Sequence, residues 1–229
     1  MTAVVAQRAR SRPRNIALYG GSFDPIHAGH LAVARAAQRR FHLDEIHFVV
    51  AGRPPHKRKQ EAAPFPHRFA MTALACAGKA CFLPSLAEAG KDFSGRSVHY
   101  SIDTVRRIRR RLARRDRLFF ILGVDSFLEI SMWREYQTLL GACHFIVASR
   151  PGFRMESLRL VIPPELLRRA AARSPRVISL RAMDVFLLDS VASDVSSSEI
   201  RRRHIVGKSI HGLVPAAVEE YIQRQGLYR

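Results

Sequence analysis

Short apolar runs alternate with amphipathic stretches along most of the chain. Residues 16–19 form an apolar run that stops at a glycine pair, and residues 28–41 repeat apolar side chains at helical spacing. A second apolar run follows at residues 46–50. The pattern predicts a strand, a helix and a strand, which together form a parallel unit with a right-handed crossover.

The same alternation continues through the rest of the sequence. We expect further helices over residues 68–77, 100–115, 165–173, 197–204 and 215–225, with two short helices flanking Trp133. We expect further strands over residues 81–83, 118–122, 144–148, 177–180 and 185–188. The sequence therefore predicts an α/β fold with a doubly wound, mainly parallel sheet. Ligands of such sheets bind at the carboxyl ends of the strands.

The length of 229 residues favours one globular domain. Residues 1–14 carry four arginines and no acidic side chain, so we expect a basic, flexible tail. Residues 15–229 are expected to form a single domain. No stretch of the sequence approaches the ~18 uninterrupted apolar residues of a membrane span, which excludes a membrane-embedded protein.

The charge is strongly positive, with 38 Lys and Arg residues against 19 Asp and Glu and a formal net charge of +19. Such a surplus favours anionic partners: nucleic acids, nucleotides, phosphorylated metabolites or an anionic membrane surface. The segment 106–117 alone holds eight arginines. A solvated basic face is the ordinary interpretation of this segment, and RNA binding is the alternative. The oligomeric state is left open.

The three cysteines predict no disulfide framework and no structural zinc site, because they form no closely spaced pair. Reduced, buried thiols are expected instead, which favours a cytoplasmic protein. No metal ligand set is predicted.

Residues 20–30, GGSFDPIHAGH, hold the most informative chemistry. They join the first strand to the first helix, where free main-chain N–H groups favour an anion. His27 and His30 are three residues apart at the start of the helix, so both rings can face one ligand and donate hydrogen bonds to phosphate oxygens. The alternatives are surface or capping histidines, or two ligands of a metal site that has no third ligand at suitable spacing.

Other side chains have their own chemistry. Lys57 is a cation in a basic, proline-rich loop, and Asp125 follows the most apolar strand, at its carboxyl end. Trp133 is the only tryptophan and either stacks on a planar ligand or anchors the core. Ser196 and Arg201 lie at and just after a helix start, where they either bind phosphate or, for the serine, simply cap the helix.

The segment GGSFDPIHAGH resembles the nucleotidyltransferases that carry an HxGH motif, and in particular the nicotinate-nucleotide adenylyltransferases. Further segments resemble that family in the same order: PHK at 55–57, YSIDT at 100–104, GVD at 123–125 followed by Trp133, SRPG at 149–152, VSSSEIR at 195–201 and YIQRQGLYR at 221–229. The resemblance covers about residues 16–229. It implies a Rossmann-like nucleotidyltransferase fold, with the helical part from about residue 190 to 229 completing an ATP site.

The resemblance also implies an activity and a set of site residues. The expected reaction transfers the adenylyl group of ATP to nicotinate mononucleotide, with Mg2+ arriving on ATP. Catalytic roles fall on His27, His30, Lys57 and Arg201. ATP would be bound by Gly20, Gly21, Ser22, Phe23, His27, His30, Gly123, Asp125, Arg150, Ser196, Ser198 and Arg201. Nicotinate mononucleotide would be bound by Ser22, Lys57, Tyr100, Ser101, Trp133 and Arg134.

The chain departs from the usual family pattern mainly around the pyridine site. His99 stands where serine is usual, Ser101 where threonine is usual, and Arg134 where an aromatic residue is common. Alternative acceptors are nicotinamide mononucleotide and phosphopantetheine. The alternative from another class is a basic nucleic-acid-binding protein with a relict nucleotide site, although no RNA- or DNA-binding motif is present. Membrane and nucleic acid are otherwise not expected as partners.

Overall fold

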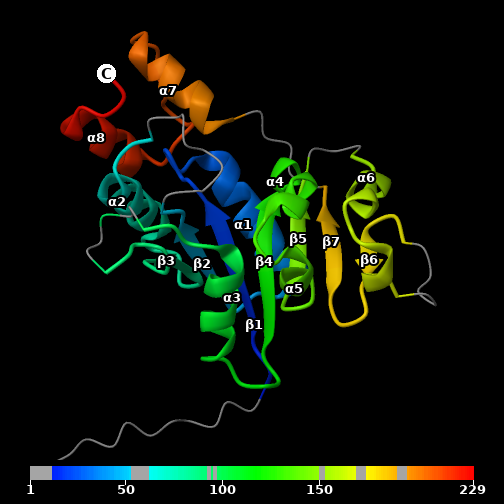
Figure 1. The fold of residues 1–229 in the computed structure, drawn as a ribbon. Coiled ribbons are helices and arrows are strands. Elements are labelled where there is room, and N and C mark those ends of the chain that lie inside the picture. Colours follow the sequence, from blue (N-terminus) through cyan, green and yellow to red (C-terminus); the bar gives the residue numbers. More distant parts are fainter. Residues whose placement is uncertain are drawn as a thin grey trace, which may run out of the picture.

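A seven-stranded sheet with the order β3-β2-β1-β4-β5-β7-β6 forms the centre of the molecule (Figure 1). The computed structural model describes residues 12–52, 62–91, 94, 97–149, 153–168, 174–189 and 195–229. All neighbouring strands pair parallel except β6 and β7, which are antiparallel. The strands are β1 (Asn15–Gly21), β2 (Glu45–Val50), β3 (Phe82–Ser85), β4 (Arg117–Gly123), β5 (His144–Ala148), β6 (Val177–Ser179) and β7 (Asp184–Leu188).

Helices cover both faces of the sheet, as the doubly wound prediction requires (Figure 1). They are α1 (Ala28–Phe41), α2 (Phe65–Cys76), α3 (Ser101–Arg109), α4 (Val124–Leu128), α5 (Tyr136–Leu140), α6 (Met155–Leu160), α7 (Ser197–Ile205) and α8 (Ala216–Gln225), with 3-10 turns η1 (Ile130–Met132) and η2 (Pro164–Leu166). The predicted fold class is confirmed.

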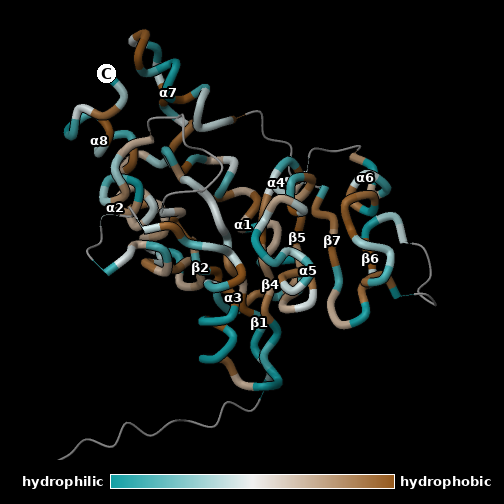
Figure 2. Tube along the Cα trace, viewed as in Figure 1, coloured by the Kyte–Doolittle hydropathy of each residue, from teal (hydrophilic) through white to brown (hydrophobic). Residues whose placement is uncertain are grey.

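Two hydrophobic clusters divide the core because successive strand side chains point to opposite faces of the sheet. In β1, Ala17 and Tyr19 pack into the cluster that includes α1, α2 and α8, whereas Ile16 and Leu18 pack into the cluster with α3 to α6. The tube coloured by hydropathy shows the apolar strands enclosed between more polar outer segments (Figure 2). Packing on both faces of the sheet holds the carboxyl ends of β1 and β4 in fixed positions.

Several predicted boundaries need correction. The helix expected over residues 100–115 ends at Arg109, since like charges at helical spacing destabilise its continuation. Asp116 then organises a turn, accepting hydrogen bonds from the main-chain N–H groups of Ala113 (3.2 Å) and Arg14 (3.0 Å). The helix expected from residue 68 begins earlier, at Phe65, with Pro66 in its first turn.

The helix expected over residues 165–173 was wrong within the described part of that range. Only the 3-10 turn η2 forms there, and Leu167 then bridges to Leu180 in extended conformation. Residues 169–173 lie outside the described parts of the chain. Helix α6 was not predicted.

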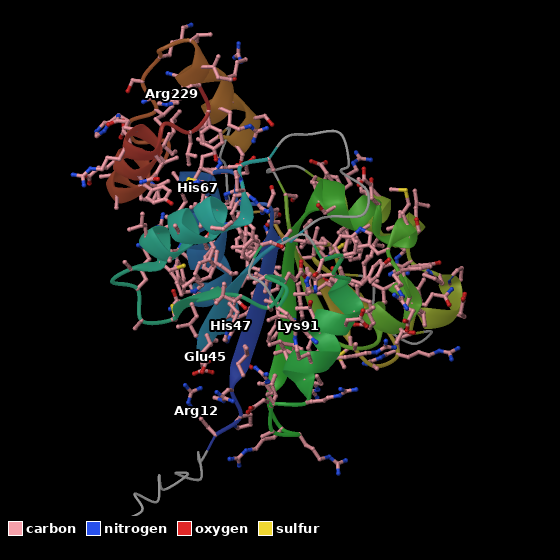
Figure 3. The ribbon with its side chains drawn as sticks, turned by 60° about the vertical axis from the view of Figure 1, so that its left-hand side comes forward. Arg12, Glu45, His47, His67, Lys91 and Arg229 are labelled. Carbon is pink, nitrogen blue, oxygen red and sulfur yellow. The ribbon has the colours of Figure 1, made fainter. Side chains whose placement is uncertain are left out.

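The end of the sheet opposite α7 and α8 carries paired basic residues. Arg12 pairs with Asp44, and Arg14 pairs with both Glu45 and Asp116. Arg12 and Glu45 lie at this end in Figure 3, far from Arg229. Arg12 is the first described residue, and its contact with Asp44 precedes the expected domain start at residue 15. Residues 1–11 lie outside the described chain, so the flexible tail stays a prediction.

Candidate active site

The carboxyl ends of β1 and β4 form the centre of the candidate site. The strands that follow β1 and β4 extend to opposite sides of the sheet, so the order reverses between these two neighbours. Open α/β sheets bind ligands at such a crevice. Gly20 and Gly21 end β1, and Gly123 ends β4 beside them.

The glycine pair leaves room for close packing of the loop that follows. A Cβ atom on Gly21 would lie 2.9 Å from the Phe23 ring, and one on Gly20 would lie 3.2 Å from Phe120. Phe23 has a φ of 47° and its side chain is fully buried against Tyr19 and Phe48. Any contact of Phe23 with a nucleotide is therefore through its main chain, while the ring anchors the loop.

His27 and His30 form a close pair of tilted rings at the start of α1, with 32° between the ring planes. Their ring centroids are 3.7 Å apart, and the main-chain N–H of His27 donates to Nδ1 of His30 at 3.2 Å. Because Nδ1 of His30 accepts this bond, the ring proton of a neutral His30 is on Nε2. Nδ1 of His27 has no hydrogen-bond partner among the described residues.

Both imidazoles are neutral near pH 7. Burial lowers the pKa of His27 to about 4. Burial, and secondarily the charge of His27, lowers the pKa of His30 well below its usual value. The pair therefore offers neutral N–H donors that are largely buried from solvent at a helix N-terminus. Such donors suit an anion and do not require a protonated histidine.

Helix α7 is fixed to the loop that leads into α1, although it lies more than 170 residues later in the chain. The Ser197 hydroxyl donates to the Pro25 carbonyl at 3.0 Å. Nη1 of Arg201 donates to the Asp24 carbonyl at 2.6 Å, and Nη2 donates to Oγ of Ser198 at 3.3 Å. These bonds place the start of α7 beside the loop that leads into the histidine pair.

Ser196 takes the capping role that the sequence left as an alternative. Its Oγ accepts from the N–H of Glu199 at 3.2 Å, so it is the N-cap of α7. This bond leaves the hydroxyl proton available for a further acceptor. Asp125 is exposed in the first turn of α4, at the carboxyl end of β4.

The Gly20–Ser22 segment also lines a cavity of about 200 Å3, whose lining includes neither His27 nor His30. The predicted pyridine-site residues are brought together around it: Ser22, Tyr100, Ser101, Trp133 and Arg134 all line the cavity. The Arg134 guanidinium lies over the Tyr100 ring at 4.6 Å, and Trp133 packs edge-on against Phe120 at 6.2 Å. Trp133 is therefore both a partial core anchor and a wall of the cavity.

Two groups of buried or half-buried polar residues at the candidate site were not predicted. Glu88 and Thr104 line the cavity, and the Thr104 hydroxyl donates to Oε1 of Glu88 at 3.1 Å. Burial raises the pKa of the Glu88 carboxyl. Arg68, only 5% exposed, donates to the carbonyls of Ser22 and Ala51 at 2.9 and 2.7 Å. Neither Glu88 nor Arg68 lies in a segment with a recognisable chemical pattern, so sequence reasoning had no signal by which to find them.

Lys57 and Arg150, predicted to bind substrate, lie outside the described residues. Within the described ranges, no three His, Cys, Asp or Glu side chains are grouped so that they could hold a metal ion. The donors around the histidine pair are imidazole, guanidinium and hydroxyl groups, which suit phosphate better than a bare Mg2+ ion. In the same ranges no helix combines the length and the apolar character needed to cross a bilayer.

The fold and the crevice define a nucleotidyltransferase, and comparisons with known proteins agree. A family model described as "Cytidylyltransferase-like" matches residues 18–203. A protein of Moorella thermoacetica named "Probable nicotinate-nucleotide adenylyltransferase" is 40% identical over 222 residues, covering 96% of this chain and 94% of the relative. A protein of Solibacter usitatus with the same name is 41% identical, covering 93% of this chain and 98% of the relative. The chain belongs to the nicotinate-nucleotide adenylyltransferase family.

Solved structures support the fold. The Plasmodium falciparum nicotinic acid mononucleotide adenylyltransferase complexed with NaAD superposes with a TM-score of 0.70, covering 94% of this chain and 97% of that one. The same enzyme complexed with APC gives a TM-score of 0.68. Both are 22% identical in sequence, so they bear on the architecture.

Proposed function

We propose that this protein transfers the adenylyl group of ATP to nicotinate mononucleotide in NAD biosynthesis, forming nicotinate adenine dinucleotide and pyrophosphate. One observation carries the proposal beyond family membership. The Gly20–Ser22 segment borders the cavity and leads directly into the loop that carries His27 and His30. Two substrates bound on either side of this segment would meet at the carboxyl end of β1.

The chemistry needs no protein nucleophile. An oxygen of the mononucleotide 5′-phosphate attacks the α-phosphorus of ATP, and the bond from this phosphorus to the oxygen that bridges to the β-phosphorus breaks. Pyrophosphate leaves with that electron pair. A phosphate is already anionic at neutral pH, so catalysis rests on positioning the substrates and stabilising developing charge.

The triphosphate side of the site is assigned to the histidine pair and α7. Neutral His27 and His30 would donate hydrogen bonds to phosphate oxygens, and Arg201 would add a permanent positive charge. Ser196, Ser198, Gly123 and Asp125 lie at the ends of elements that border the crevice. Lys57 is assigned to the reacting phosphates as a cation in a basic loop, and Arg150 is assigned to ATP by family resemblance alone.

The acceptor side is assigned to the cavity. Trp133 and Tyr100 offer ring surfaces for the pyridine ring, and Ser101 offers a hydroxyl. Arg134 brings a cation to the rim, which would favour the acid substituent of nicotinate over the amide. Mg2+ would arrive on the ATP phosphates, where it would neutralise charge. A cytoplasmic location is supported by the free thiols of Cys76, Cys81 and Cys143.

The test is pyrophosphate release from MgATP with three acceptors: nicotinate mononucleotide, nicotinamide mononucleotide and phosphopantetheine. We expect turnover to be fastest with the first. Preference for either other acceptor would keep adenylyl transfer and overturn the acceptor assignment. Absence of turnover with all three, together with tight RNA binding that weakens steeply with salt, would favour the nucleic-acid-binding alternative.

A further inference from the structure

Asp24 is a buried carboxylate at which three distant parts of the chain meet. Asp24 is only 3% exposed to solvent. Oδ1 accepts hydrogen bonds from the Tyr228 hydroxyl at 2.7 Å and from the N–H of Ala63 at 3.2 Å. Oδ2 lies 3.5 Å from Nη1 of Arg201, whose shorter contact of 2.6 Å is to the Asp24 carbonyl.

Tyr228 is held in position by the chain reversal after α8. Gly226 ends the helix with a φ of 60°, and the N–H of Leu227 donates back to the Ile222 carbonyl at 3.1 Å. Tyr228 itself has a φ of 61°, a conformation that non-glycine residues adopt at a cost of about 1 kcal/mol or more. Surrounding contacts must hold a residue in such a conformation, and the bond to Asp24 is one of them.

Burial, together with the charge of Asp24, raises the pKa of the Tyr228 phenol, so it is a hydrogen-bond donor throughout the physiological range. With Oδ1 occupied by two donors, Asp24 makes only a loose ion pair with Arg201. Without the phenol, the carboxylate would be free to bind Arg201 more closely and draw its guanidinium away from the crevice.

We propose that Tyr228 is a positioning residue for adenylyl transfer, whose hydroxyl holds Asp24 so that Arg201 stays directed at the ATP phosphates. The inference rests on the proposed function. Tyr228 lies more than 200 residues from Asp24 in the sequence and is not assigned to a substrate. Its effect on ATP passes through Asp24 and then through Arg201.

The test compares two tyrosine variants in the same segment. Tyr228→Phe removes the hydroxyl that bonds Asp24. Tyr221→Phe is the matched control, since its hydroxyl bonds Nδ1 of His67 on α2 at 3.0 Å and not Asp24. His67 is labelled on α2 beside α8 in Figure 3. For each variant we would measure kcat, KM for both substrates, the ATP dissociation constant without acceptor, and Tm.

Tyr228→Phe should raise KM and the dissociation constant for ATP about tenfold, as expected for the loss of one hydrogen bond to a charged group. KM for nicotinate mononucleotide should change less than about twofold, because the cavity is not touched. Tyr221→Phe should leave ATP binding within about twofold of wild type while lowering Tm. Equal effects of the two variants on ATP would overturn the proposal.

A double-variant cycle tests the route through Arg201. In an Arg201→Lys background, adding Tyr228→Phe should weaken ATP binding less than about twofold further, because the group that Tyr228 positions has already changed. Independent, multiplying effects would contradict the proposed link. If wild-type protein binds ATP but transfers no adenylyl group, the proposed function fails, and the same ATP binding measurements still decide the role of Tyr228.

Discussion

The rings of His27 and His30 lie 3.7 Å apart between centroids, and the main-chain N–H of His27 donates to the ring of His30. One nitrogen of His30 therefore serves the structure of the helix start, while the other can serve a ligand. This division of roles within one ring allows the structural role to be separated from the catalytic role by substitution.

His30→Ala should lower kcat by about a hundredfold or more, because it removes a donor aimed at developing charge. His30→Asn should lose as much activity, since its side chain is too short to replace Nε2. Its amide oxygen can still accept from the N–H of His27, so its unfolding free energy should exceed that of the alanine variant by about 1 kcal/mol. Steady-state kinetics and denaturant unfolding measure the two effects, and wild-type kcat in either variant would remove His30 from the mechanism.

Acid should destabilise the folded protein earlier than its carboxylates alone would suggest. The pKa of His27 is lowered to about 4, and that of His30 is also lowered, chiefly by burial. A histidine in the unfolded chain binds a proton below about pH 6.5, so the unfolded state binds protons that the folded state does not bind. Stability is full above this pH and falls as the pH drops toward 4, by up to about 3 kcal/mol for His27.

Denaturant unfolding at a series of pH values between 4 and 7 measures this loss. The variant carrying both His27→Asn and His30→Asn should show a shallower slope over this range. His99 and His144, whose pKa values are also lowered by burial, should leave part of the slope in place. An unchanged slope in the double variant would contradict the assignment of buried, neutral rings.

Gly21→Ala should destabilise the fold by about 1–3 kcal/mol, because the new Cβ would lie 2.9 Å from the buried Phe23 ring. Gly123→Ala is the matched control at the end of the neighbouring strand. No described atom lies within 4 Å of a Cβ at Gly123, so the change should stay within about 0.5 kcal/mol. Thermal or denaturant unfolding compares them, and equal losses would argue against the close packing of the β1 loop.

Arg134→Gln should reduce the preference for nicotinate over nicotinamide mononucleotide by about three- to tenfold, the size expected of a partly exposed charge. Arg106→Gln is the control, since Arg106 bonds Glu135 next to Arg134 but does not line the cavity. The ratio of kcat/KM for the two acceptors is the measurement. An unchanged ratio for Arg134→Gln would assign acid selection to other groups.

The sequence predicted elements best where one apolar pattern was sufficient. Strand β5 and helix α1 have the expected bounds, because β5 is a continuous buried apolar run and α1 repeats buried side chains on one face. The end of α3 was missed because it depends on repulsion among arginines and on Asp116, which is tied to Arg14 across the sheet. Such a contact joins residues about a hundred positions apart, so it produces no periodic pattern in the sequence.

The site shows the same limit. The histidine pair and the cavity residues lie in segments that resemble a family, so they could be proposed in advance. Arg68 donates to main-chain carbonyls, Glu88 accepts from the Thr104 hydroxyl, and Tyr228 donates to the buried Asp24 carboxylate, each from another part of the chain. Their partners are set by the three-dimensional fold, and a single sequence gives no spacing rule for them.

The contacts of Asp24 with residues 177 and 204 positions later also bear on how the protein folds. Contacts of such sequence separation form after local ones, because closing long loops is entropically costly. The sheet and its covering helices can therefore assemble while α7 and α8 are still undocked, and a chain at that stage has no complete triphosphate site. If ATP binds only the arrangement with both helices docked, as the proposed function requires, it also acts as a folding ligand that favours the docked state of α7 and α8.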